Sequence, residues 1–353
     1  IIAAWNGGGT SDISNWTGAA WCTHNTSRLF YGDVDGNGEV DAICHDYVTG
    51  TRWVATSHGR LLQQTSVTVA GFCAGGSGDE LVTGDFNGDG RTDVLCHSKA
   101  TGTLTIDYAD STGAFHSSAS WWSRPSVSWC TGATQRLLAG DVTGDGRTDL
   151  ICHDTSVGDI SWMDALVGGT FDGLEYGVTP VNVCNGYRDW LYVGEFDGPT
   201  PDGLSLHPRS DLLCFHGSYG TFWIEHSHNP YGVFYGTPDF TLPQSWVSTQ
   251  TCTTNANCPS QYYQTCDAGF CTEHVCSAVN SDLTVADLTG DGITDVLCTY
   301  YRDDGDGNPR NDAVAYTSGI RAFGGVSDHA GSFNVPFSWF QGSASAYPFN
   351  TSQ

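Results

Sequence analysis

Short apolar runs alternate with glycine-rich turns along most of the chain, and the pattern recurs at a regular interval. One such run is Val94–Cys96, and in an earlier unit the turn Thr49–Gly50 leads into the aromatic segment Thr51–Val54. Runs of this length, bounded by Gly and Asp and rich in branched and aromatic residues, are typical of β-strands. The pattern therefore predicts units of three or four short antiparallel strands in an all-β chain.

An acidic loop precedes each apolar run, and its first acid falls at residues 33, 85, 141, 195 and 287. Units of about fifty residues match β-propeller blades, because a small sheet buries both faces only when neighbouring sheets cover it. The longer last interval places a disulfide-rich insertion at residues 252–276. We predict one β-propeller domain over residues 1–353 with five blades.

Two alternatives to this architecture remain open at the level of sequence. A linear β-solenoid also repeats short strands, although its coils are usually shorter than this unit. Six blades are the other alternative, because the strand-like segments 1–5 and 13–21 precede the first loop. These segments could complete the last blade, contribute to a sixth blade or pair with a neighbouring molecule.

The net charge of the chain excludes some classes of binding partner. It has 39 acidic residues against 13 basic ones and a formal net charge of −26. Such a surface repels nucleic acid and anionic membranes, so we expect neither as a partner. No apolar run approaches the length of about 18 residues that a membrane-spanning helix needs, so membrane insertion is not expected.

The acidic residues are concentrated in the recurring loop. In the first copy, oxygen-bearing side chains stand at loop positions one, three, five and nine, with Gly38 at position six. This spacing turns alternate oxygens toward one centre, as in the front half of an EF-hand, where position seven offers a backbone carbonyl. The bidentate Glu expected at position twelve is replaced by Cys44, and a strand follows in place of a helix. We predict calcium ligands at Asp33, Asp35, Asn37 and Asp41, with the carbonyl of Glu39.

The loop resembles the FG-GAP or integrin-alpha-type repeat, also found in VCBS-like repeat proteins, whose acidic loop joins two strands of a propeller blade. The resemblance implies about four or five Ca²⁺ ions and, by position, further ligands in the other copies. These are Asp85, Asn87, Asp89, Arg91 and Asp93; Asp141, Thr143, Asp145, Arg147 and Asp149; and Asp287, Thr289, Asp291, Ile293 and Asp295, where the Arg and Ile residues offer carbonyls. The fourth copy is swollen by extra residues and would use Glu195, Asp197, Asp202 and Asp211.

Fourteen cysteines at regular spacing point to an oxidising compartment and to one disulfide within each blade. The predicted pairs are Cys22–Cys44, Cys73–Cys96, Cys130–Cys152, Cys184–Cys214 and Cys276–Cys298. The remaining Cys252, Cys258, Cys266 and Cys271 lie in the insertion, and Cys252 could replace Cys276 as the partner of Cys298. Sequons at Asn15, Asn25 and Asn350 would accept glycans in a secreted protein.

The sequence contains no hydrolase signature, and the clustered acids have a better use as calcium ligands than as catalysts. We therefore predict a secreted, non-enzymatic binding or adhesion protein with glycans or extracellular proteins as partners, including further copies of this chain. Lectin-like carbohydrate binding is favoured because the resemblance includes sugar-binding propellers. Trp53, Trp162 and Trp223 follow the hairpin turn at matching places in three blades and could stack on a sugar, or pack between blades. The alternatives are a subunit of an extracellular glycoprotein filament or coat, and a non-catalytic part of a secreted hydrolase.

Overall fold

The computed structural model divides the chain into two units, Ile1–Gly177 and Val178–Gln353, and each is described by itself. The elements described are β1 to β25, all of them β-strands. Within the described ranges, no helix is long and apolar enough to cross a membrane. The structure describes residues 22, 26–58, 61–69, 71–75, 78–116, 122–124, 128–171, 176–177, 182–186, 189–196, 209–216, 221–227, 240–241, 246–251, 253–254, 264–267, 270–273, 281–286, 294–302, 310–316 and 337–343.

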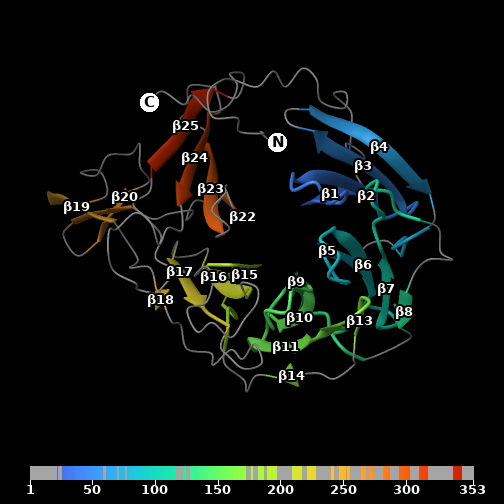
Figure 1. Ribbon diagram of the computed structural model, residues 1–353. Coiled ribbons are helices and arrows are strands. Elements are labelled where there is room, and N and C mark those ends of the chain that lie inside the picture. Colours follow the sequence, from blue (N-terminus) through green and yellow to red (C-terminus); the bar gives the residue numbers. More distant parts are fainter. Residues whose placement is uncertain are drawn as a thin grey trace. The chain divides into compact units, whose positions relative to one another are not determined.

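The first unit contains three four-stranded antiparallel sheets, which we call repeats 1 to 3 (Figure 1). Repeat 1 consists of β1 (Ser27–Gly32), β2 (Asp41–Asp46), β3 (Thr51–His58) and β4 (Leu61–Val69). Repeat 2 consists of β5 (Asp79–Gly84), β6 (Asp93–Ser98), β7 (Thr103–Asp107) and β8 (Trp122–Arg124). Repeat 3 consists of β9 (Gln135–Gly140), β10 (Asp149–Asp154), β11 (Asp159–Met163) and β14 (Tyr176–Gly177), with a small hairpin of β12 (Ala165–Leu166) and β13 (Thr170–Phe171).

The second unit contains two further four-stranded sheets, repeats 4 and 5, separated by a three-stranded sheet of order β19-β21-β20. Repeat 4 consists of β15 (Asp189–Gly194), β16 (Asp211–His216), β17 (Thr221–Glu225) and β18 (Phe240–Thr241). Repeat 5 consists of β22 (Ser281–Ala286), β23 (Asp295–Arg302), β24 (Arg310–Tyr316) and β25 (Phe337–Ser343). The sheet between them is β19 (Trp246–Thr251), β20 (Gln264–Asp267) and β21 (Phe270–Glu273), and its last two strands lie within the predicted insertion 252–276.

Four strands per repeat and an antiparallel order confirm the predicted unit. Its second strand is buried in repeats 1 and 2: β2 is buried throughout and β6 at all but its last residue. Ile43 and Val54 of repeat 1 share a cluster with Leu81 and Val94 of repeat 2. Leu95 and Leu104 of repeat 2 share a second cluster with repeat 3. Side chains that alternate along β6 therefore supply both cores, with Val94 on one face and Leu95 on the other.

Four of the predicted disulfides are present, namely Cys22–Cys44, Cys73–Cys96, Cys130–Cys152 and Cys184–Cys214. Each fastens the segment ahead of a repeat to the second strand of that repeat. The first cysteine of every such pair lies in the left-handed region, with φ between 50° and 57°, which non-glycine residues seldom adopt. In the predicted pair Cys276–Cys298, Cys276 lies outside the described residues, as do Cys252 and Cys258 of the insertion and the side chains of Cys298, Cys266 and Cys271.

Candidate metal centre

The first acid of the loop organises its backbone. In repeat 1, Asp33 Oδ1 accepts the N–H groups of Gly36 and Asn37, at 2.8 and 3.0 Å, and Oδ2 accepts the N–H of Gly38 at 2.7 Å. Gly38 has a φ of +84°, so the predicted tight turn at position six is real and disfavours any side chain there. Three N–H donors thus fix both oxygens of this carboxylate inside the loop.

The loops of repeats 2 and 3 repeat these hydrogen bonds atom for atom. Asp85 accepts from Gly88, Asp89 and Gly90 at 2.7, 3.1 and 2.7 Å. Asp141 accepts from Gly144, Asp145 and Gly146 at 2.7, 3.2 and 2.8 Å. Equal geometry in three copies means that the loop is one structural unit that has been repeated, since independent polar turns would not share every bond.

The acid at position nine has a different task, because it joins the loop to the chain at or just after the end of the third strand. Asp93 is buried, and its Oδ2 accepts the N–H of Phe86 at 3.2 Å while its Oδ1 accepts that of Ala109 at 2.9 Å. Three other repeats make the same pair of bonds. They are Asp41 with Val34 and Ser57, Asp149 with Val142 and Ala165, and Asp211 with Phe196 and Ser227.

Electrostatics favour a cation at these loops. Burial raises the pKa of Asp93 to about 8, and the carboxylates of Asp89 and Asp85 add to the rise. Burial likewise raises the pKa of Asp41 and Asp149, with nearby loop carboxylates contributing in both cases. A bound divalent ion would offset this repulsion, and an all-oxygen donor set suits Ca²⁺. The residues of the loop therefore fit the predicted ion.

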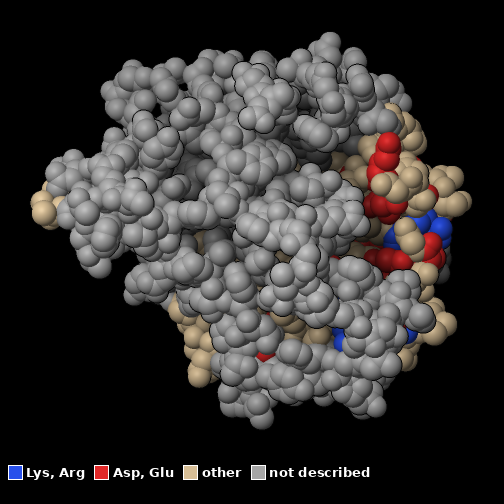
Figure 2. Space-filling model, turned by 60° about the vertical axis from the view of Figure 1, so that its left-hand side comes forward, with Lys and Arg blue, Asp and Glu red and all other residues tan. Residues whose placement is uncertain are grey.

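The loops differ in how their carboxylates are balanced. In repeat 1, oxygens of Asp33, Asp35 and Asp41 lie within 4.8 Å of one another, the one all-carboxylate group of three found in the described part of the chain. In repeats 2 and 3 the residue at position seven is an arginine. The guanidinium of Arg91 pairs with Asp89, and that of Arg147 pairs with Asp145. Figure 2 shows acidic and basic side chains next to one another on the described part of one face.

The loops also connect neighbouring repeats. The residue at position eight donates its N–H to the carbonyl of the first acid in the repeat before it: Thr92 to Asp33 at 2.6 Å and Thr148 to Asp85 at 2.7 Å. Thr294 and Glu195 form the same bond, at 2.5 Å, inside the second unit. We call this hydrogen bond, together with the packing of the threonine against the glycine before the acid, the clasp. A side chain on that glycine would collide with the threonine, as at Gly32, Gly84 and Gly194.

The fourth and fifth loops are described in part. In the fourth loop Glu195 and Asp211 are placed, whereas Asp197 and Asp202 lie outside the described residues. In the fifth, Asp295 begins β23, and Asp287, Thr289, Asp291 and Ile293 lie outside them. The sequons at Asn15, Asn25 and Asn350 also lie outside them.

The three tryptophans predicted as ligand-binding candidates do not occupy matching places. Trp53 and Trp223 stand opposite the half-cystines Cys44 and Cys214, but Trp162 stands opposite Ile151. Trp162 is therefore one residue out of register and points to the other face of its sheet, so the expectation of equivalence was wrong for it. Trp162 and Trp223 are buried, which favours the packing alternative for both.

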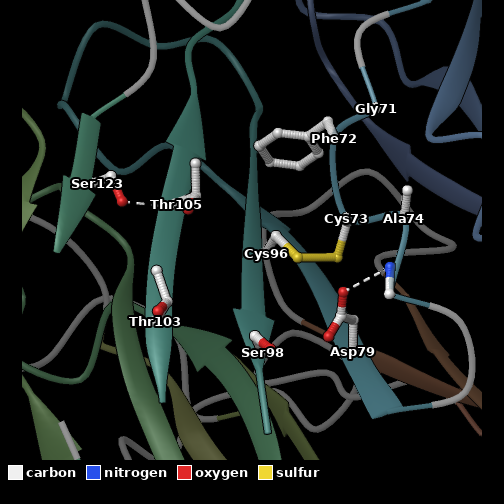
Figure 3. A pocket seen from close by; sticks show the side chains of 11 residues that line it. Gly71, Phe72, Cys73, Ala74, Asp79, Cys96, Ser98, Thr103, Thr105 and Ser123 are labelled. Atoms are coloured by element: carbon white, nitrogen blue, oxygen red, sulfur yellow. Dashed lines mark hydrogen bonds between the residues drawn. A yellow bond between two sulfur atoms is a disulfide. The ribbon is translucent and has the colours of Figure 1, made fainter. Parts of the chain in front are cut away.

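A pocket of about 390 Å³ lies in repeat 2. The segment Gly71–Gly75, the disulfide Cys73–Cys96 and one face of strands β6, β7 and β8 line it (Figure 3). Hydroxyl groups and one carboxylate, that of Asp79, dominate its polar wall. Its residues are spread over the linking segment and strands β5, β6, β7 and β8, and no local motif marks them in the sequence.

Comparison with known proteins identifies the repeat. The FG-GAP-like repeat family matches residues 33–96 and 85–152, two overlapping copies that span loops 1 to 3. No curated protein matches the chain. Among solved structures, a lectin of Agrocybe aegerita that recognises non-reducing terminal N-acetylglucosamine is 13% identical, with 89% of this chain and 80% of that chain covered and a TM-score of 0.49. A putative 6-phosphogluconolactonase from Bacteroides fragilis is 10% identical, with 92% and 84% covered and a TM-score of 0.34. At these scores neither likeness bears on function.

Proposed function

We propose that the protein is a secreted, calcium-stabilised β-propeller that acts as a non-enzymatic extracellular binding protein, with glycans as its ligands. The observation that carries this proposal is the recurrence, repeat after repeat, of one acidic loop fastened to one disulfide-linked strand. Such units stiffen a scaffold. They recur because each sheet needs neighbouring sheets to cover its apolar faces. The five repeats support five blades.

Calcium would be held in repeat 1 by Asp33, Asp35, Asn37 and Asp41, with the carbonyl of Glu39, and in the other repeats by the residues at the same loop positions. When bound, the ion supplies positive charge to a buried carboxylate cluster. The chain's own contribution is the loop shape, because three N–H donors orient the first acid and two orient the last. Folding and metal binding are therefore expected to be coupled.

A binding role is favoured over catalysis because the clustered acids are already engaged. Asp33, Asp85 and Asp141 each accept three backbone N–H groups, and the acids at position nine each accept two. Carboxylates held in this way orient a loop, whereas a general acid or base must reach a substrate proton. The four disulfides support an extracellular setting, where such bonds persist.

A glycan array probed with the full chain, with calcium and after its removal by EDTA, tests the ligand class. We expect binding to neutral glycans that free sugar inhibits and that EDTA weakens by loosening the scaffold. Absence of any sugar-inhibitable signal from a folded, calcium-loaded protein would remove glycans as the ligand.

One observation favours a second function, a subunit of an extracellular filament or coat. Leu29 and Tyr31 on β1 are 37% and 42% exposed, whereas Leu81 and Leu137, which hold the place of Leu29 in repeats 2 and 3, are 6% exposed. An apolar strand face left open in this way suits self-association. Electron microscopy of the purified protein in calcium tests it: filaments favour the subunit, and single particles at high concentration exclude it.

A further inference from the structure

The pocket in repeat 2 is a built cavity between a linking segment and a sheet face (Figure 3). Its floor is the disulfide Cys73–Cys96, whose half-cystines are 7% and 6% exposed. The Oδ2 atom of Asp79 accepts the N–H of Gly75 at 2.9 Å, which holds the carboxylate against the linking segment. Cross-strand neighbours form the opposite wall, where Thr105 Oγ1 lies 3.5 Å from Ser123 Oγ.

Repeat 3 fills the corresponding place with an indole. Trp129 precedes the half-cystine Cys130 as Phe72 precedes Cys73, and Ser161 stands opposite Cys152 as Thr105 stands opposite Cys96. Trp129 is 3% exposed, and its Nε1 donates to Ser161 Oγ at 2.9 Å. The shorter ring of Phe72 cannot make that bond, so the hydroxyl of Thr105 faces a cavity.

Repeat 4 places its tryptophan on the other side of the same gap. There the linking residue is small, Val183, and Trp223 stands opposite the half-cystine Cys214. Both side chains are buried, at 1% and 9% exposed. Among repeats 1 to 4, repeat 2 is thus the one with no tryptophan at either position, and its gap is open.

The chemistry of the lining selects the ligand. Ser98, Thr103, Thr105 and Ser123 offer hydroxyls, each able both to donate and to accept, as the hydroxyls of a sugar do. Asp79 is the one charged group of the lining and accepts only, so it favours hydroxyl donors and repels anions. Phe72, which is 1% exposed, and the disulfide form the apolar part of the lining, against which sugar C–H groups can lie. The volume of about 390 Å³ lies in the range of ordinary small-ligand sites.

We propose that this pocket binds a neutral pyranose unit of a glycan, with Asp79 and the hydroxyls of Thr105 and Ser123 as its polar contacts. This assignment rests on the proposed glycan-binding function and adds its location. Asp79 should repel an acidic sugar, and the tryptophan-filled gaps of repeats 3 and 4 should bind no sugar.

Ligand-observed NMR on the full, calcium-loaded chain tests the site, with methyl glycosides of glucose, galactose, mannose and N-acetylglucosamine as probes. Phe72→Trp rebuilds in repeat 2 the filling found in repeat 3, and it should weaken binding at least about tenfold by occupying the cavity. Thr105→Val keeps the shape, removes one hydroxyl and should cost about fivefold. Ser161→Ala, the matched change in repeat 3, should leave the affinity unchanged.

Discrimination is tested by replacing the glucose probe with glucuronic acid. The wild-type chain should bind it at least about fivefold more weakly than glucose, and Asp79→Asn should narrow that gap, because the amide oxygen can still accept from Gly75. Thermal melts establish that each variant is folded.

The outcomes separate this inference from the proposal on which it rests. If the wild-type chain binds a neutral sugar and Phe72→Trp and Thr105→Val bind it equally well, the glycan function stands and the pocket assignment is overturned. If the wild-type chain binds none of the probes and no glycan on the array, both are overturned.

Discussion

The interface between repeats 1 and 2 and the interface between repeats 2 and 3 share a frame and differ in their interiors. In both, a threonine at loop position eight clasps the repeat before it, through Thr92 and Asp33 in one and Thr148 and Asp85 in the other. In both, a disulfide fastens the linking segment to the next sheet. We call the clasp and the disulfide together the frame, which is the same at both interfaces.

The interiors diverge at two places. A buried ion pair, Arg52 with Asp107, stands between repeats 1 and 2. By register, Leu104 and Met163 stand at those positions between repeats 2 and 3, where they belong to an apolar cluster. The linking residue also changes, from Phe72 to Trp129. The comparison teaches that the loops and disulfides hold the repeats together, which leaves the interior free to vary and to open a pocket.

The polar interior is expensive to bury. Both side chains of the Arg52–Asp107 pair are fully buried, and burial lowers the pKa of Arg52 to about 10, although Asp107 opposes that change. The guanidinium carbon lies 4.2 Å from the centre of the Phe72 ring and 4.9 Å from that of Phe115. Two aromatic faces and one carboxylate thus replace the water that the charge has lost.

The largest expected effect comes from breaking this pair on one side. Asp107→Ala leaves the Arg52 charge buried without its partner and should lower the free energy of unfolding by about 3–5 kcal/mol, measured by urea denaturation. The ion pair would be unimportant to the interface if the loss stayed below about 1 kcal/mol in a variant that kept its fold.

The clasp should give the next largest effect, and an equal one at both interfaces. Gly32→Ala and Gly84→Ala each place a methyl group against the threonine of the following repeat, and overpacking of this kind costs about 1–3 kcal/mol. Gly78→Ala is the control, because a side chain there meets nothing within 4 Å. If Gly32→Ala and Gly84→Ala lowered the free energy of unfolding no more than Gly78→Ala does, the clasp would not contribute to stability.

Sequence alone predicted the frame better than the interior. The loop positions, four disulfide pairs and the four-stranded unit follow from local spacing, which one repeat reveals and the others verify. The clasp joins residues such as Gly32 and Thr92 in different repeats, so spacing within one unit does not show it. The pocket exists because the Phe72 side chain leaves the space next to Thr105 empty, and this depends on packing between segments that are distant in the sequence. Trp162 was misassigned because an offset of one residue turns a strand side chain to the opposite face.

A smaller effect is expected from exchanging one interior for the other. The double variant Arg52→Leu with Asp107→Met gives repeats 1 and 2 the residues found between repeats 2 and 3. Replacing a buried ion pair by apolar residues of similar size is often neutral or stabilising, so the free energy of unfolding should change by less than about 1 kcal/mol or rise. If the double variant lost as much free energy of unfolding as Asp107→Ala does, the interior of one interface could not replace that of the other.

The dependence of stability on pH should differ with and without calcium. The pKa of Asp93 in the metal-free fold, about 8, lies above the value of about 3.9 of an unfolded Asp. The metal-free protein therefore loses stability as the pH rises through this window, since the folded state holds a proton that the unfolded state releases. Burial lowers the pKa of His45 to about 4, which costs stability as the pH falls below about 6.5, with calcium or without it. The gain from calcium should thus grow from pH 5 to pH 8.

The most direct measurement of the central claim, that the repeated acid loops are calcium-filled clamps, is the melting temperature of the full chain in calcium and in EDTA, combined with elemental analysis of the dialysed protein. The account predicts about four or five calcium ions per chain and a melting temperature lowered by on the order of 5 °C or more in EDTA, with the larger shift at pH 8. An identical melt in both buffers, together with no bound calcium, would contradict it.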